Sequence, residues 1–222
     1  ADTFTAREGV LRNVGGIFGG DGVSTPGLTK TGPGTLRIEG TNTYEGGTVL
    51  NEGTLLVDGS LNGGVAASSG TTLGGDGIIN GVVNLAGATL APGNGVGSLD
   101  INGSLTLGNN STLEIRLDGP TPGLGYDQVN MTSAVGSVSI GSNVTLSLSL
   151  GFTPNTTVDT FYYILTREDN GVGFGNMFAG LNEGASIDLG NGIVGKLTYF
   201  ANWTGDSATS SFTGGNDVAI AV

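Results

Sequence analysis

Apolar residues alternate with polar ones along residues 28–59, and the same alternation occurs twice. Leu36 and Ile38 stand two positions apart, as do Leu55 and Val57, so each pair points to one face of an extended strand. Glycine and threonine precede each pair, and a glycine follows it. Two looser copies come after these, and the four leucines are separated by 19, 18 and 17 residues: Leu36, Leu55, Leu73 and Leu90. The pattern predicts a short strand that recurs at a nearly constant period.

A strand with one apolar face cannot bury that face alone. Stacked on similar strands at about 4.8 Å, it completes an apolar column and a parallel ladder of hydrogen bonds. A repeat of 17–19 residues leaves no room for a crossover helix, and its glycines mark corners where the chain bends sharply. The period therefore predicts an all-β fold, a parallel β-solenoid with one coil per repeat.

The repeated stretch also resembles a known family. Its residues follow the pattern L-T-K-x-G-x-G-T-L-x-I-x-G-x-N-T-Y-x-G-G-T over residues 28–48, and G-T-L-x-V-x-G returns at 53–59. This pattern is similar to the autotransporter-associated β-strand repeat of bacterial surface proteins. The order of motifs after residue 126 also resembles the C-terminal region of such proteins. The resemblance implies a right-handed parallel β-solenoid located outside the cell or on the bacterial surface, and it implies no chemistry.

The chain divides into three parts by residue pattern and composition. Residues 25–118 carry the repeats and predict about five coils, with inward apolar pairs that include Ile78-Ile79 and Val82-Val83. Asn-Gly pairs at 62, 80, 94 and 102 predict turns between strands. Pro120 and Pro122 predict a boundary because proline stops strand pairing. Residues 119–222 are then a β-rich C-terminal cap, plugged by aromatic side chains: Phe161, Tyr163, Phe174, Phe178, Phe200 and Trp203.

Residues 1–24 match no repeat but carry apolar residues between glycines. They predict either a cap over the first coil or an extended arm that pairs with a neighbouring subunit. In the second case the segment supports head-to-tail self-association, because contacts between non-identical surfaces do not close and so produce fibres. The candidate self-assembly residues are Val10, Leu11, Ile17 and Phe18.

Composition excludes several classes of function. Seven basic residues against nineteen acidic ones give a net charge of −12, and the basic residues are scattered singly. Binding to nucleic acid or to an anionic membrane requires clustered positive charge, so neither is expected. The chain has no cysteine and no histidine, which removes zinc–thiolate sites, thiol catalysis and the serine–histidine–aspartate triad. No run of apolar residues predicts a membrane span.

Carboxylates on the coils are the remaining candidates for chemistry. Asp58 and Asp76 are 18 residues apart, close to one coil, but each stands in a glycine-containing turn. Isolated Gly-Gly-Asp-Gly segments leave room for an incidental calcium ion and predict no dedicated calcium array. Tyr44 or Trp203 could serve as a platform for sugar, although burial is the simpler expectation for both. We predict no catalytic, cofactor-binding or metal-binding residue.

The sequence therefore predicts an extracellular or cell-surface structural protein that acts as an adhesive, a spacer or a filament-forming subunit. Its partners are other copies of the chain or a cell-surface glycan. The alternative is a carbohydrate-binding or carbohydrate-degrading module on the same scaffold. The lack of histidine, cysteine and clustered carboxylates favours the non-enzymatic interpretation.

Overall fold

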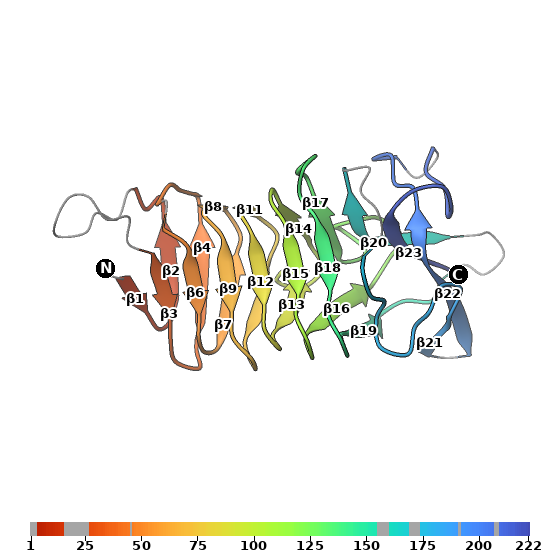
Figure 1. Cartoon of the computed structure of the whole chain (residues 1–222), viewed down its shortest axis with the longest axis horizontal. Helices are drawn as coiled ribbons and strands as arrows, with labels where there is room; N and C mark the ends of the chain where they lie inside the picture. The colour runs from red at the N-terminus through yellow and green to blue at the C-terminus, as the bar shows by residue number, and fades with distance from the viewer. Residues whose placement is uncertain are drawn as a thin grey trace.

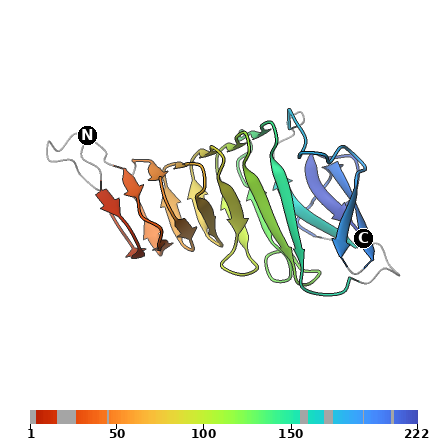
Figure 2. The same cartoon turned by 90° about the horizontal axis from the view of Figure 1, so that it is seen from below.

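The computed structural model describes residues 4–15, 27–44, 46–154, 160–168, 174–190, 192–206 and 209–222. Within these ranges every regular element is a β-strand, and the strands form three sheets along one elongated body (Figures 1 and 2). Each turn of the chain adds one strand to the first sheet, one to the second and one to the third. The protein is the parallel β-solenoid that the repeat period predicts.

Helices that could cross a membrane are not found among the described residues.

The first and second sheets are parallel throughout, with seven strands each. The first sheet consists of β1 (Phe4–Ala6), β3 (Leu28–Lys30), β6 (Thr48–Leu50), β9 (Val65–Ala67), β12 (Val83–Leu85), β15 (Leu105–Leu107) and β18 (Val138–Ile140). The second consists of β2 (Gly9–Arg12), β4 (Thr35–Glu39), β7 (Thr54–Val57), β10 (Thr72–Gly75), β13 (Thr89–Pro92), β16 (Thr112–Leu117) and β19 (Thr145–Leu150).

The third sheet begins parallel and ends antiparallel. Its parallel strands are β5 (Thr41–Asn42), β8 (Ser60–Asn62), β11 (Ile78–Asn80), β14 (Ser98–Ile101), β17 (Gln128–Met131) and β20 (Phe161–Arg167). After β20 the neighbours are antiparallel: β23 (Asp217–Ala221), β22 (Ile193–Ala201) and β21 (Ser186–Gly190). The change of direction is where the coils stop and the C-terminal cap begins.

The predicted leucine column is confirmed. Leu36 pairs with Leu55, Leu55 with Leu73, and Leu73 with Leu90, and all four side chains are buried. The column continues to Leu113 on β16. Burying a leucine side chain stabilises the folded state by about 1.5–3 kcal/mol, so the column is a main contributor to stability.

Two residues of the predicted inward pairs point outward instead. Ile78 is 41% exposed and Val82 is 48% exposed, whereas their neighbours Ile79 and Val83 are buried. Successive residues of a strand face opposite sides, so only one member of an adjacent apolar pair can reach the core.

Glycine at the corners is required by close contact between coils. Gly53 has a φ of +71°, and a Cβ there would lie 2.5 Å from the carbonyl oxygen of Gly34 on the preceding coil. A side chain at this position would strain the backbone and collide with the coil below. This explains the glycine that precedes Thr54-Leu55 in the repeat.

The N-terminal segment forms the first coil in part. β1 pairs with β3 and β2 pairs with β4, and Leu11, opposite Ile38, packs against the core. Val10 faces outward and is 50% exposed. Ile17 and Phe18, the other two candidate self-assembly residues, lie outside the described residues.

Parallel stacking does not stop at residue 118, where the prolines suggest a boundary. β17, β18, β19 and β20 continue all three sheets. Pro120 and Pro122 instead lie in the loop between β16 and β17, where the carbonyl of Thr121 accepts hydrogen bonds from Leu124, Gly125 and Tyr126. A proline in such a loop interrupts no ladder, so one longer coil accommodates both.

The aromatic residues predicted to form one plug divide between two apolar clusters, the main core with Phe174 and Phe178 and a separate cluster with Tyr163, Phe161 and Trp203. Tyr163, Phe174 and Phe178 are buried in the C-terminal cap, and Phe161 is half-buried. Phe200 faces outward on β22 and is 48% exposed. Its neighbours Tyr199 and Ala201 point inward, which leaves position 200 on the solvent side.

Candidate functional site

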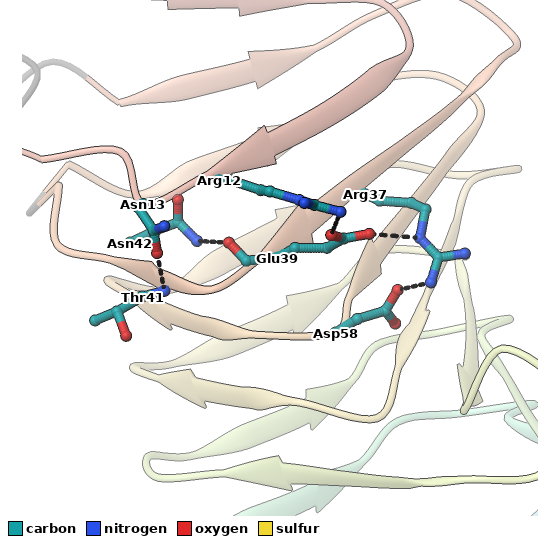
Figure 3. Close-up of polar contacts among 7 residues, drawn as sticks. All are labelled: Arg12, Asn13, Arg37, Glu39, Thr41, Asn42 and Asp58. Atoms are coloured by element: carbon teal, nitrogen blue, oxygen red, sulfur yellow. Dashed lines mark hydrogen bonds and ion pairs between the residues drawn. The ribbon is translucent and has the colours of Figure 1, made fainter.

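A ladder of charged side chains joins the first three coils on the outer face of the second sheet (Figure 3). Arg12 on β2 pairs with Glu39 on β4, and Arg37 Nε lies 3.5 Å from Glu39 Oε1. Arg37 also pairs with Asp58, which follows β7. The ladder alternates in sign, so each step is attractive.

Asp58 is the least exposed member of the ladder. Burial raises the pKa of its carboxyl group, the adjacent Arg37 guanidinium opposes that shift, and Asp76 on the next coil adds to it. Asp58 is therefore engaged with Arg37, while Asp76 is exposed. The arrangement holds coils together, and the two carboxylates differ too much in setting to form an evident acid–base pair.

Asn42 ties the same coils from inside. Its side chain is fully buried, its amide donates to the carbonyls of Glu39 and Ser60, and its Oδ1 accepts the N–H of Val14 at 2.9 Å. The neighbouring Thr41 N–H donates to Asn13 Oδ1 (Figure 3). A buried amide with its donors and its acceptor engaged stabilises the one register that satisfies it.

Lys30 is a buried cation that sequence reasoning passed over. Its ammonium group donates to the carbonyls of Thr31, Gly32 and Glu52, the last on the next coil. Burial lowers the pKa of Lys30, although Glu52 and Glu8 oppose this. The lysine stands in the Leu-Thr-Lys start of the repeat, and that position was the only signal of a role.

Asparagine side chains form a further ladder at the corner after the third sheet. Asn80 Nδ2 donates to Asn62 Oδ1 at 3.2 Å, and Asn102 Nδ2 donates to Asn80 Oδ1 at 3.3 Å. These are three of the Asn-Gly turns that the sequence indicates, now seen to lie one above another. Like the charged ladder, these side-chain hydrogen bonds hold adjacent coils together.

A metal site is not evident in the part of the chain that the structure describes, where no three histidine, cysteine, aspartate or glutamate residues are grouped to hold an ion. The features above are structural contacts. The arrangement best suited to bind a ligand lies elsewhere.

A polar cleft of about 820 Å³ lies at the C-terminal end of the solenoid. Its floor includes Asp100, Asn130 and Thr166, on β14, β17 and β20 of the third sheet. Its wall is formed by the two ends of the single loop that connects β22 to β23, residues 202–205 and 214–216, drawn in blue at the C-terminal end in Figure 1. The cleft falls within the size range of small-ligand sites.

Trp203 stands in the wall of this cleft. The residue is partly exposed, and the centroid of its ring lies 4.8 Å from that of the Tyr163 ring. The backbone N–H of Trp203 donates to Asp217 Oδ2 at 2.6 Å, which holds the loop in place. Burial was the simpler expectation for this residue, and the structure instead shows it partly exposed among the residues that line the cleft. Tyr44, by contrast, is fully buried and hydrogen-bonded to Thr48.

Comparison with known proteins identifies the repeat. Residues 28–57 match the family described as Passenger-associated-transport-repeat. This confirms the predicted autotransporter-type repeat. The fold that the repeat implies and the fold observed agree over these residues, which span β3 to β7.

A curated relative points to the same class. Over 75 residues the chain is 41% identical to an extracellular serine protease of Serratia marcescens. The aligned stretch covers 34% of this chain and 7% of the protease. The chain thus spans a small part of the relative it matches. Together the repeat and this relative establish an extracellular or cell-surface β-solenoid.

Proposed function

We propose that this chain is a rigid extracellular spacer, a rod of stacked coils that holds neighbouring segments or partners apart at the cell surface. The observation that carries the proposal is the register of the three sheets. Each coil repeats the last, with leucine above leucine in the core and asparagine above asparagine at a corner. Such a rod lengthens by about 4.8 Å for each coil.

The spacer role requires no catalysis. Asp58, the more buried of the two candidate carboxylates, is paired with Arg37 and shares a ladder with Glu39. The matched repeat is a structural unit, and the protease named in the comparison shares only a small part of its length with this chain. We therefore propose a non-enzymatic role for the coils.

Removal of one whole coil tests the proposal. Deletion of residues 54–71 joins Gly53 to Thr72, and because Thr54 already stacks on Thr72 the register of the second sheet is kept. A spacer should remain folded and become shorter by about one strand spacing. Deletion of residues 54–62 is the matched control, since half a coil brings core positions to the wrong face and should unfold the protein.

Small-angle scattering and thermal unfolding give the two measurements. The full chain of 222 residues should have a radius of gyration above the about 17 Å of a compact domain of that length. The coil-deleted chain should have a smaller one and still unfold cooperatively. Loss of folding in both deletions would contradict a modular rod.

Self-association is a second candidate, and the strand edges of the first coil favour it. Among the described strands β1 has one neighbour and β2 has one neighbour, and Phe4 and Val10 are exposed beside these edges. An open edge can pair with another strand through its backbone. Light scattering at increasing concentration tests this. Growth of assemblies that Val10→Lys reduces supports it, whereas a monodisperse monomer at high concentration contradicts it.

A further inference from the structure

The C-terminal cleft carries an inference beyond the spacer role. Asp100, Asn130 and Thr166 stand in register on three adjacent strands of the third sheet, all on its outer face. The same positions on earlier coils are Ile78, Ser60 and Thr41. The apolar Ile78 separates Asp100 from the polar residues of the earlier coils, so the row Asp100, Asn130 and Thr166 is a distinct polar row beside the loop that connects β22 to β23.

Hydrogen bonds fix the orientation of this row. Asn130 Nδ2 donates to Asp100 Oδ1 at 3.0 Å and to Ser98 Oγ at 2.8 Å. Thr166 Oγ1 donates to Asn130 Oδ1 at 2.8 Å. Asn130 thereby uses both of its amide hydrogens and its oxygen to hold its neighbours. The second carboxylate oxygen of Asp100 remains available as an acceptor.

Glu168 adds a second carboxylate at the rim. It follows β20 directly, it is exposed, and it lines the cleft. Within the described part of the chain, the side chain of Glu168 makes no hydrogen bond and no ion pair. Two acceptors of this kind suit a ligand rich in hydroxyl groups, because each carboxylate can accept two hydrogen bonds.

Trp203 is the aromatic residue among those that line the cleft, beside these acceptors. Its ring packs against Tyr163, and the residue as a whole is partly exposed. An aromatic face beside hydrogen-bonding groups matches a molecule with one C–H face and polar edges. Sugar rings have this amphipathic shape.

The charge of the cleft selects among sugars. Asp100 and Glu168 repel anions, and the net charge of −12 adds to this at long range. Arg167 is the basic residue of the lining, and its guanidinium lies over the ring of Phe174, 5.1 Å from the centroid. Sulfated and uronic acid chains are disfavoured for this reason, and the polar lining disfavours an apolar ligand.

We propose that this cleft binds a neutral saccharide chain, stacked on Trp203 and hydrogen-bonded to Asp100 and Glu168. The proposal does not depend on the spacer role, since a rod can present a sugar-binding end or lack one. It assigns recognition to the C-terminal end of the molecule and length to the coils.

Trp203 supplies the measurement, because it is the only tryptophan of the chain. Its fluorescence reports on the cleft without any label. The probes are soluble gluco-, manno- and galacto-oligosaccharides of about four to six units. Chains of this length are long enough to span a cleft of this size class. At least one neutral series should change the emission in a saturable way and protect the indole from acrylamide quenching.

Two pairs of variants decide whether the cleft is responsible. Glu168→Ala should weaken binding about tenfold, because a hydrogen bond to a charged group is lost, and Asp100→Asn should weaken it less. Glu114→Ala, which removes an exposed carboxylate on the second sheet, and Phe200→Ala, which removes an exposed aromatic ring outside the cleft, should leave binding unchanged.

The deletion of residues 54–71 separates this proposal from the spacer role, since it leaves every residue of the cleft lining in place. Binding should persist in that variant. Absence of a saturable response to every neutral oligosaccharide overturns the proposal. So does tighter binding of a sulfated chain, or equal affinity in Glu168→Ala and Glu114→Ala.

Discussion

The side-chain amide of Gln128 donates a hydrogen bond to the backbone carbonyl of Tyr163 at 2.7 Å, and both groups are buried. The N–H of Tyr163 donates to the hydroxyl of Tyr126 at 3.2 Å. Backbone pairing between β17 and β20 begins only at Val129 and Leu165. Hydrogen bonds from two side chains, Gln128 and Tyr126, therefore take the place of backbone pairing at the start of β20, where this strand turns from the solenoid toward the antiparallel cap.

Gln128→Met should destabilise the protein by about 1–3 kcal/mol, because a buried carbonyl loses its donor while the side-chain volume is kept. Chemical denaturation measures the change. Ser139→Ala, on the exposed outer face of β18, is the control and should stay within about 0.5 kcal/mol of the parent. Equal stability of both variants would show that the contact does not support the junction.

Leu55→Ala should cost about 2–5 kcal/mol, because it leaves a cavity in the buried column between Leu36 and Leu73. Leu56→Ala, one residue further along the same strand, removes an outward side chain and should cost clearly less. The comparison uses unfolding free energies from the same denaturant series. A larger cost at Leu56 would mean that the register of β7 is wrong.

The charged ladder should respond unequally to its two arginines. Arg12 is largely exposed, so Arg12→Ala should change stability by at most about 1 kcal/mol. Arg37→Ala should cost more, because it leaves the poorly solvated Asp58 carboxylate without its cation. Adding Asp58→Asn to Arg37→Ala should then restore part of the loss. Failure of that rescue, measured by a double-mutant cycle, would show that the pair is not coupled.

Asp127 predicts a pH dependence. Burial raises the pKa of its carboxyl group to about 6, against hydrogen bonds from the N–H groups of Arg116 and Gly97. The folded state thus binds this proton more tightly than the unfolded state, where the pKa is about 3.9. Its contribution is fully present below about pH 4 and is lost as the pH rises through about 6.

The shift corresponds to about 3 kcal/mol between those limits. Unfolding free energies at about pH 4 and about pH 7 should therefore show the parent losing stability relative to Asp127→Asn as the pH rises. The variant also loses one backbone hydrogen bond, but that loss is the same at both pH values. A difference between parent and variant that does not change with pH would refute the assignment.

Most of the coil region could be predicted from residue spacing. The leucines at 36, 55, 73 and 90 recur at one coil per repeat, and a period of that length with flanking glycine permits few folds other than a solenoid. Alternation within each strand also identified Ile38 and Val57 as inward. Alternation could not show which of Ile78 and Ile79 faces the core, because both are apolar and only the register of the strand decides which one points inward.

The end of the solenoid could not be found in this way. Two prolines at 120 and 122 indicated a boundary, yet the strands resume because the chain leaves the ladder in a loop and returns. Local residue preference reports where pairing is interrupted. It does not report whether the chain comes back to the same sheets, which depends on contacts between residues thirty or more positions apart.

Residue spacing and composition are sufficient to predict a stack of short parallel strands with a leucine core and an extracellular type of repeat, because those properties are local. The position of the cleft, in contrast, emerges from the folded arrangement of the chain. Asp100, Asn130, Thr166 and Trp203 are spread over about a hundred residues and follow no common pattern. They meet because three coils stack in register and the loop that connects β22 to β23 lies beside the outer face of the third sheet, a long-range arrangement that residue spacing does not encode.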